Sequence, residues 1–210
     1  MSEFAFATGA ATPRKRPVQG RSHETVAAIV AATFRVLDDD GEALTTTRVA
    51  EVAGVSVGTL YQYFSNRDAL INGALAEHLE AAIGAVESAA AEAEALALTP
   101  ALAAERMVRA FLAVKADRAP ISRVLNRVFG IGKLDDRPVV RAASQRAQRA
   151  VARALAAGRA IDPALAQRAE IACAALEGVV RSAIDDDPDR LRDPRWIEQV
   201  VQVAVGAMTE

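Results

Sequence analysis

Apolar side chains recur along this chain at helical spacing. From Ser22 onward an apolar stripe repeats every third or fourth residue, as one face of an amphipathic helix requires. The stripe is formed by Val26, Ile29, Val30, Thr33, Phe34 and Leu37. Gly41 follows an acidic run and is expected to end this helix. Residues 1–20 lack the periodicity and contain prolines and glycine, which predicts a flexible arm.

Two short helices and a long one are predicted next. The threonines at 45–47 supply N-cap hydroxyls for a helix over 48–53, and Gly54 provides the left-handed residue that ends it. Ser56 can cap a second short helix over about 57–64. Ser65, with an acidic residue three positions later, forms a capping-box pattern for a helix that runs to about residue 95.

The rest of the chain also has helical periodicity. A proline, whose fixed φ is tolerated in the first turn of a helix, occurs at or near each predicted start. Helices are expected near 100–117, 120–130, 136–158, 162–185 and 193–208. No stretch shows the sustained alternation of a β-strand. The pattern therefore predicts an all-α protein of about nine helices.

The segment TRVAEVAGVSVGTLYQYF, residues 47–64, has the features of a helix-turn-helix. Ala50 is small enough for two helices to cross closely, and Gly54 allows the sharp turn between them. The side chains expected to join the two helices are Val49, Ala53, Val55, Leu60 and Tyr63. An ordinary αα-hairpin would need the same alanine and glycine, so these positions alone do not identify a DNA-binding motif.

The outer face of the second short helix discriminates between the two possibilities. Thr59, Tyr61 and Gln62 are uncharged hydrogen-bonding residues, and Gly58 leaves room for a close approach. A helix that only faces solvent more often carries Glu and Lys there. This face therefore favours DNA reading over an ordinary hairpin. Tyr63 and Phe64 lie at helical spacing and are expected to be core residues.

The longer segment TTRVAEVAGVSVGTLYQYFSNRDAL, residues 46–70, resembles the DNA-binding domain of the TetR family of bacterial transcriptional regulators. The similarity spans about residues 20–72, and the pattern GVSxGTLYxYFxxxxxL is its specific part. It implies three regions: a flexible basic arm over 1–20, a helix-turn-helix DNA-binding domain over 21–68, and a helical ligand-binding and dimerisation domain over 69–210. The last region fits the family in length and helix number.

The resemblance also implies which residues contact the bases and phosphates of double-stranded DNA. Thr59 and Gln62 are candidates for base contacts, since glutamine matches adenine bidentately in the major groove. Val57 offers no hydrogen bond and would touch a thymine methyl group, with Gly58 beside it. Phosphate contacts are expected from the Tyr61 hydroxyl and from the threonines at the start of the first short helix, Thr46 and Thr47.

Several cations complete the DNA-contact set that the resemblance implies. Arg48 would contact either the DNA backbone or a base. Arg67 occupies a position where family members usually carry lysine, and would bind phosphate. A basic cluster near the N-terminus would follow the minor groove or the flanking backbone. That cluster comprises Arg14, Lys15, Arg16 and Arg21. A plain solvated linker is the alternative for these four residues.

The last two predicted helices carry apolar residues on more than one face. A surface helix needs only one apolar stripe, so a second buried surface is expected, and a two-fold homodimer supplies it. Burial on both sides within one domain is the alternative. A symmetric dimer would present two recognition helices and would therefore bind a palindromic operator.

The middle helices are expected to enclose a ligand pocket. The candidate wall residues are apolar, and ordinary core is the alternative that each residue favours on its own. They are Met107, Phe111, Val114, Leu125, Val128, Phe129 and Ile131. The sparse polarity of this set indicates a small hydrophobic effector. The resemblance implies that effector binding favours a conformation with lower affinity for DNA.

Composition narrows the remaining function classes. The chain has 210 residues with a formal net charge of -2, which gives no global sign of nucleic-acid binding, although a basic footprint can be local. Cys173 is the only cysteine, which predicts a reducing cytoplasmic location without an intramolecular disulfide. No apolar run reaches the roughly 18 residues of a membrane span. No metal-binding, cofactor or nucleophile motif is present, so an enzyme is not expected.

The sequence thus predicts a dimeric, ligand-responsive DNA-binding regulator, with repression as the expected direction of control. The alternative is a helical small-molecule-binding or protein-interaction module that has kept the hairpin but lost DNA binding.

Overall fold

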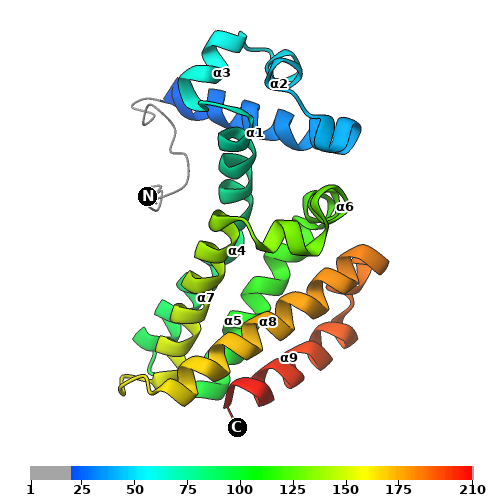
Figure 1. The fold of residues 1–210 in the computed structure, drawn as a ribbon. Helices are drawn as coiled ribbons and strands as arrows, with labels where there is room; N and C mark the ends of the chain where they lie inside the picture. The colour runs from blue at the N-terminus through cyan, green and yellow to red at the C-terminus, as the bar shows by residue number, and fades with distance from the viewer. Residues whose placement is uncertain (1–19, 210) are drawn as a thin grey trace. The chain divides into compact units, whose positions relative to one another are not determined.

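The computed structural model describes residues 20–209, and the side chains of all of these except Gly20, Arg21, Ile131 and Gly132. Within that range the chain forms nine α-helices, two short 3-10 helices and no strand (Figure 1). The α-helices are α1 Gly20–Asp40, α2 Thr46–Ala53, α3 Val57–Tyr63, α4 Arg67–Ala95, α5 Pro100–Asp117, α6 Ala119–Asp135, α7 Pro138–Ala156, α8 Pro163–Asp186 and α9 Pro194–Thr209. The 3-10 helices are η1 Gly41–Ala43 and η2 Pro188–Arg192. The predicted all-α fold is confirmed.

Local capping explains why the first short helices begin and end where they do. Thr45 Oγ1 accepts a hydrogen bond from the backbone N–H of Arg48 at 3.2 Å, so α2 begins at Thr46. Ser56 Oγ accepts from the N–H of Thr59 at 2.9 Å and starts α3 in the same way. Between them Gly54 has φ 69°, the left-handed conformation predicted for the turn.

The structure corrects the predicted cap of α4. Asn66, rather than Ser65, satisfies the first turn, because its Oδ1 accepts from the N–H of Ala69 at 2.8 Å. Asn66 directly precedes Arg67, the first helical residue, and its short amide side chain reaches the N–H three positions later, as a capping residue does.

Helix α6 is interrupted at Gly130. This residue has φ 66° and ψ 167°, which is not a helical conformation, and the helix resumes beyond it to Asp135. The sequence pattern predicted a helix end at 130, so the position of the break was anticipated and the continuation was not. Only glycine adopts this conformation without steric cost.

The chain divides into two compact units. The first contains residues 20–78 together with Val124–Ala142, and so reaches beyond the helix-turn-helix predicted over 21–68. In this unit α1 contacts α2, and α2 contacts α3 (Figure 1). Its core consists of side chains that are almost completely buried. They include Ile29, Leu37, Leu44, Val49, Leu60, Leu70, Ile71 and Leu75.

The second unit contains residues 79–123 and 143–209. Helix α9 contacts α5 and α8, and η2 contacts all three (Figure 1). Alanines supply much of the core, which lets these helices approach closely around larger residues such as Met107, Leu112 and Ile184. None of the helices in the described part of the chain is long and apolar enough to span a membrane.

Candidate nucleic-acid interface

The helix-turn-helix is held together by three side chains that have almost no exposure. Val49 and Ala50 of α2 and Leu60 of α3 are each 1% exposed or less. Burial of these groups removes apolar surface from water and fixes α2 against α3. Phe64, which follows α3, is also buried at 3% exposure, as its spacing predicted. Tyr63 is only half-buried.

Because Leu60 faces inward, other α3 side chains face solvent. Val57 is 36% exposed and Tyr61 is 42% exposed, and Gly58 and Gln62 are exposed as well. Thr59 is half-buried, and its Oγ1 lies 2.8 Å from Ser56 Oγ. No residue of α3 carries a charge. This helix therefore presents a short, uncharged surface with hydrogen-bonding and apolar groups side by side.

The structure brings together two hydroxyls predicted to bind phosphate. Thr46 Oγ1, at the first residue of α2, lies 3.0 Å from the Tyr61 hydroxyl of α3. Thr47 is exposed beside them. Both hydroxyls can donate to an anion if they exchange their mutual hydrogen bond for it. They lie at the start of α2, where unpaired backbone N–H groups also favour negative charge.

Arg48 follows Thr47 in the first turn of α2. Its Nη1 forms an ion pair with Glu51 Oε2 at 3.0 Å, and both side chains are largely exposed. The hydrogen bond to Glu51 raises the pKa of the Arg48 guanidinium, so this residue stays cationic. An exposed pair of this kind holds its partners weakly, and Arg48 can exchange Glu51 for another anion at little cost.

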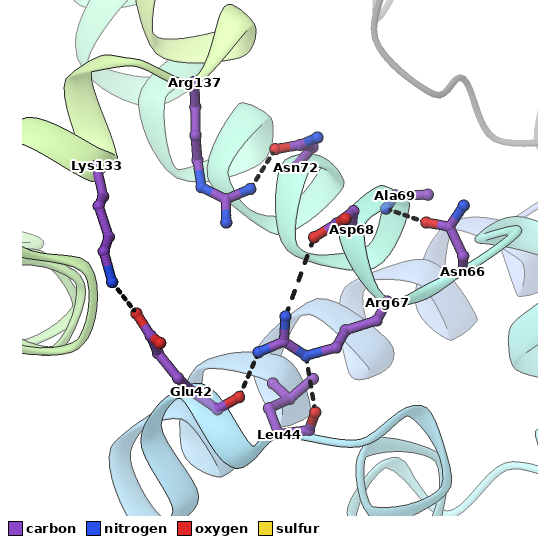
Figure 2. A network of polar contacts seen from close by, with 9 residues as sticks. All are labelled: Glu42, Leu44, Asn66, Arg67, Asp68, Ala69, Asn72, Lys133 and Arg137. Atoms are coloured by element: carbon purple, nitrogen blue, oxygen red, sulfur yellow. Dashed lines mark hydrogen bonds and ion pairs between the residues drawn. The ribbon is translucent and has the colours of Figure 1, made fainter.

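Arg67 donates to two backbone carbonyl oxygens of its own chain. Its Nε donates to the carbonyl oxygen of Leu44 at 2.9 Å, and its Nη2 donates to the carbonyl oxygen of Glu42 (Figure 2). Both acceptors lie in the connection between α1 and α2. The sequence gives no sign of these bonds, because the acceptors are backbone atoms more than 20 residues away.

Of the N-terminal basic cluster, one residue lies within the described part of the chain. Arg14, Lys15 and Arg16 lie outside the described residues. Arg21 belongs to α1, and its side chain is among those not described. The role of these four cations on DNA therefore stays a prediction.

Three further cations of the first unit, which sequence reasoning missed, bind the α1–α4 region from α6 and from the residue before α7. Arg127 forms an ion pair with Asp38, and Lys133 Nζ pairs with the Glu42 carboxylate at 3.1 Å. Arg137 donates to Asn72 Oδ1 at 2.8 Å (Figure 2). These pairs span more than 60 residues, so no local sequence pattern marks them.

Arg137 is also half-buried against an aromatic ring. Its guanidinium carbon lies 4.7 Å from the centroid of Phe129, a cation–π contact. Burial lowers the pKa of the Arg137 guanidinium, although an arginine remains charged at physiological pH. Phe129, predicted as a pocket wall, thus contacts Arg137 within the first unit.

Comparison with known proteins identifies the arrangement. Residues 29–74 match the family model described as bacterial regulatory proteins, tetR family. A TetR family transcription regulator from Marinobacter aquaeolei superposes with a TM-score of 0.62 at 17% identity, over 89% of this chain and 96% of that chain. A TetR-family regulator from Streptomyces coelicolor gives 0.61 at 22% identity, over 88% and 97%. The chain has the TetR-family fold.

A further structural likeness covers most of the chain. The fatty acid degradation regulator FadR from Bacillus halodurans superposes with a TM-score of 0.63 at 15% identity, over 86% of this chain and 97% of that chain. No curated protein matches the sequence significantly. Together, the match over 29–74 and the TetR-family fold support a DNA-binding transcription regulator.

The predicted pocket residues of this TetR-family fold fall into both units. Met107 and Phe111 are buried in the second unit, where Val114 is half-buried. Leu125, Val128 and Phe129 belong to the first unit. The side chain of Ile131 is not described. Whether these residues line a pocket therefore stays a prediction. Among the residues described, no group of three or more His, Cys, Asp or Glu is placed to hold a metal ion.

Proposed function

We propose that this TetR-type protein is a sequence-specific transcriptional regulator that binds a palindromic operator as a homodimer, represses transcription, and is released by a small hydrophobic effector. The observation that carries the proposal is the outer surface of α3. It is uncharged, it is exposed at Val57, Tyr61 and Gln62, and Leu60 anchors it from behind.

Base reading is assigned to the exposed groups of α3. Gln62 carries the amide that matches adenine, and Thr59 offers a hydroxyl. Val57 supplies an apolar contact suited to a thymine methyl group, because the major groove has no other methyl group. Gly58 lets the helix backbone come close to the base edges. These contacts select sequence, whereas phosphate contacts set the register.

Phosphate contacts are assigned to the start of α2. The paired hydroxyls of Thr46 and Tyr61, with Thr47 beside them, form a compact set of donors. Arg48 adds a positive charge, which is paired with the exposed Glu51. The N-terminal cluster Arg14, Lys15, Arg16 and Arg21 is assigned to the minor groove or the flanking backbone.

Dimerisation is assigned to α8 and α9. On α8 an exposed stripe of small and apolar side chains runs along one face: Ile171, Ala174, Ala175, Gly178 and Val179. On α9, Val203 is 74% exposed. An exposed apolar stripe on a helix that already buries another face supports a second packing partner, and a second copy of this chain supplies it with two-fold symmetry.

The effector is assigned to the helical core. Met107, Phe111 and Val114 share one helix of the second unit, and their chemistry suits an apolar ligand. In one conformation the recognition helices of the dimer do not match the operator. An effector that binds this conformation more tightly than the DNA-binding one lowers the affinity for the operator, and the ratio of the two effector affinities limits the size of the effect.

Selection of genomic DNA fragments by the purified protein tests the proposal. Enrichment of a few palindromic sites at physiological salt is the expected result. The variant T59A/Q62A should then lose about 30-fold or more in specific affinity, since each of the two lost base contacts costs about 1–3 kcal/mol. The matched control S144A/Q145A removes a hydroxyl and an amide from exposed residues of α7 and should bind normally.

Two outcomes would refute the proposal. In one, effector-free protein captures no preferred sequence. In the other, T59A/Q62A selects the same sites with the same affinity as the unaltered chain while its helical content is unchanged.

A further inference from the structure

Arg67 ties the start of α4 to the connection between α1 and α2. Its Nε donates to Leu44 O at 2.9 Å and its Nη2 donates to Glu42 O at 2.5 Å, as Figure 2 shows. Two nitrogens of one planar guanidinium thus hold two carbonyl oxygens that lie two residues apart. Such charge-assisted bonds are about twice as strong as neutral ones. We call this pair of bonds the Arg67 clamp.

The clamped connection leads directly into the proposed DNA surface. The Leu44 side chain is 1% exposed, and the next residue, Thr45, caps α2. Thr46 follows, and its hydroxyl lies 3.0 Å from that of Tyr61 on α3. The backbone that Arg67 holds is therefore the backbone that sets the start of α2, and through Thr46 the phosphate-binding hydroxyls.

Both the backbone and the side chain of Glu42 have partners. Its carbonyl oxygen accepts from Arg67, and its carboxylate pairs with Lys133 Nζ at 3.1 Å. The Arg67 charge has a further neighbour, because its Nη1 lies 4.0 Å from Asp68 Oδ1. The two carbonyl bonds thus engage two of the five guanidinium N–H groups, and a carboxylate lies on the Nη1 side of the fork.

We propose that Arg67 is a positioning residue, which holds the α1–α2 connection so that α2 and α3 meet DNA in register, and that it does not bind phosphate. The inference rests on the proposed DNA-binding function. It reassigns the residue that the family resemblance made a phosphate contact. Arginine suits the clamp because its planar guanidinium can donate to two acceptors from two different nitrogens. Lysine has a single donor nitrogen.

Binding of the selected operator at several salt concentrations tests this role. The variants are R67Q and R67K, with R149Q of α7 as the control for loss of an exposed positive charge. Both Arg67 variants should raise the Kd by about tenfold or more, since bonds to charged groups are the stronger class. Their salt dependence should match that of the unaltered chain, because no phosphate contact is lost. R149Q should leave the Kd unchanged.

A phosphate contact predicts the opposite pattern. The slope of log K against log salt would fall by about 0.9 in R67Q. R67K would recover both the affinity and the slope, since an ammonium group also binds phosphate. Either result would overturn the clamp, and so would an R67Q protein that binds with unchanged affinity.

A measurement on the unaltered chain keeps the inference testable even where the variants unfold. The Nε–H of Arg67 should exchange slowly with water, and should show scalar coupling to the Leu44 carbonyl carbon in NMR spectra. Both signals should persist when operator DNA is added. A rapidly exchanging Nε–H without this coupling, or loss of the coupling on DNA, would refute the clamp. Failure of the free protein to select any DNA sequence would instead overturn the proposed function.

Discussion

The ring of Phe64 lies against Gly73 so closely that no side chain fits between them. A Cβ atom at residue 73 would overlap Cε1 of the ring and stand 3.2 Å from its Cδ1. Phe64 ends the helix-turn-helix and is 3% exposed, while Gly73 lies in α4. The contact thus packs the end of α3 onto the following long helix, and the glycine is required by space, since its φ is ordinary.

Replacing Gly73 with alanine should therefore destabilise the protein, although alanine is the better helix former. We expect G73A to lose about 1–3 kcal/mol of unfolding free energy, because the buried ring has to shift. The control G84A lies in the same helix, where a Cβ meets nothing within 4 Å. It should gain about 0.5–1 kcal/mol. Urea unfolding measures both, and equal effects would contradict the packing argument.

A substitution at Gly58 should affect stability and DNA binding in opposite directions. A Cβ there would meet only Ser56 Oγ, at an ordinary 3.7 Å. In a helix this substitution should stabilise by about 0.5–1 kcal/mol. On the exposed face of α3, however, the added methyl group stands where a base edge must approach. We expect G58A to unfold at higher urea concentration and to bind its operator more weakly. Unchanged operator affinity would show that DNA does not approach this side of α3.

Much of the helix-turn-helix was predictable because its signals are local. Thr45, Gly54 and Ser56 act through hydrogen bonds and dihedral angles that involve residues three or four positions away. The helix over 100–117 was likewise predicted with both ends as observed, since Pro100 marks its start. The α4 cap was misassigned by one position, because Ser65 and Asn66 are both good capping residues and the sequence does not rank them.

The contacts of the candidate site were less accessible to sequence reasoning. The α3 surface could be predicted from helical periodicity, since an inward Leu60 forces neighbouring residues outward. The bonds of Arg67 could not, because backbone carbonyls accept hydrogen bonds whatever residue carries them. The pairing of Lys133 with Glu42 depends on how segments distant in sequence fold together. Such contacts follow from tertiary packing, on which residue spacing carries no information.

Lys115 and Glu177 form an asymmetric ion pair in the second unit. The Lys115 side chain is 9% exposed and its Nζ lies 2.7 Å from Glu177 Oε1, whereas the Glu177 side chain is 37% exposed. The ammonium also lies 5.3 Å from the centre of the Phe111 ring. Loss of the glutamate would strand a buried charge, but loss of the lysine would leave a carboxylate that water can reach.

The two single variants should therefore differ in unfolding free energy. We expect E177Q to lose about 2 kcal/mol or more, and K115M to be neutral within about 1 kcal/mol or more stable. Thermal and urea unfolding of both proteins at neutral pH provides the measurement. If K115M proves the more damaging change, the pair stabilises the fold by attraction rather than by relieving a buried charge.

Cys173 should be an unreactive thiol in the folded protein. Burial, and to a lesser degree the charge of Glu177, raise the pKa of the Cys173 thiol from 9.0 to about 11. Since the thiolate is the nucleophile, alkylation by iodoacetamide at pH 8 should be much slower in the native protein than in urea. Equal rates in the two states would contradict the burial.

The same pKa shift makes a prediction about stability. The folded state favours the protonated thiol, so Cys173 stabilises the fold fully below pH 9.0, and this contribution declines as the pH rises toward 11. C173S removes the shifted thiol, because serine does not titrate in this range. The variant should therefore lose less stability than the unaltered chain between these pH values. Parallel losses in urea unfolding would assign the alkaline sensitivity to other groups.

The exposed apolar residues of α8 and α9 predict where a charge prevents dimerisation. Ile171 is 60% exposed and Val203 is 74% exposed, so arginine at either position costs a monomer little. In a two-fold interface the new arginine would be buried without a partner. Because both protomers carry the substitution, the interface would contain two such charges. I171R and V203R should sediment as folded monomers and bind the palindromic operator weakly. Leu96, which follows α4, is 63% exposed and supplies the control L96R, which should remain dimeric. Dimers that persist in both I171R and V203R would move the interface away from these two helices.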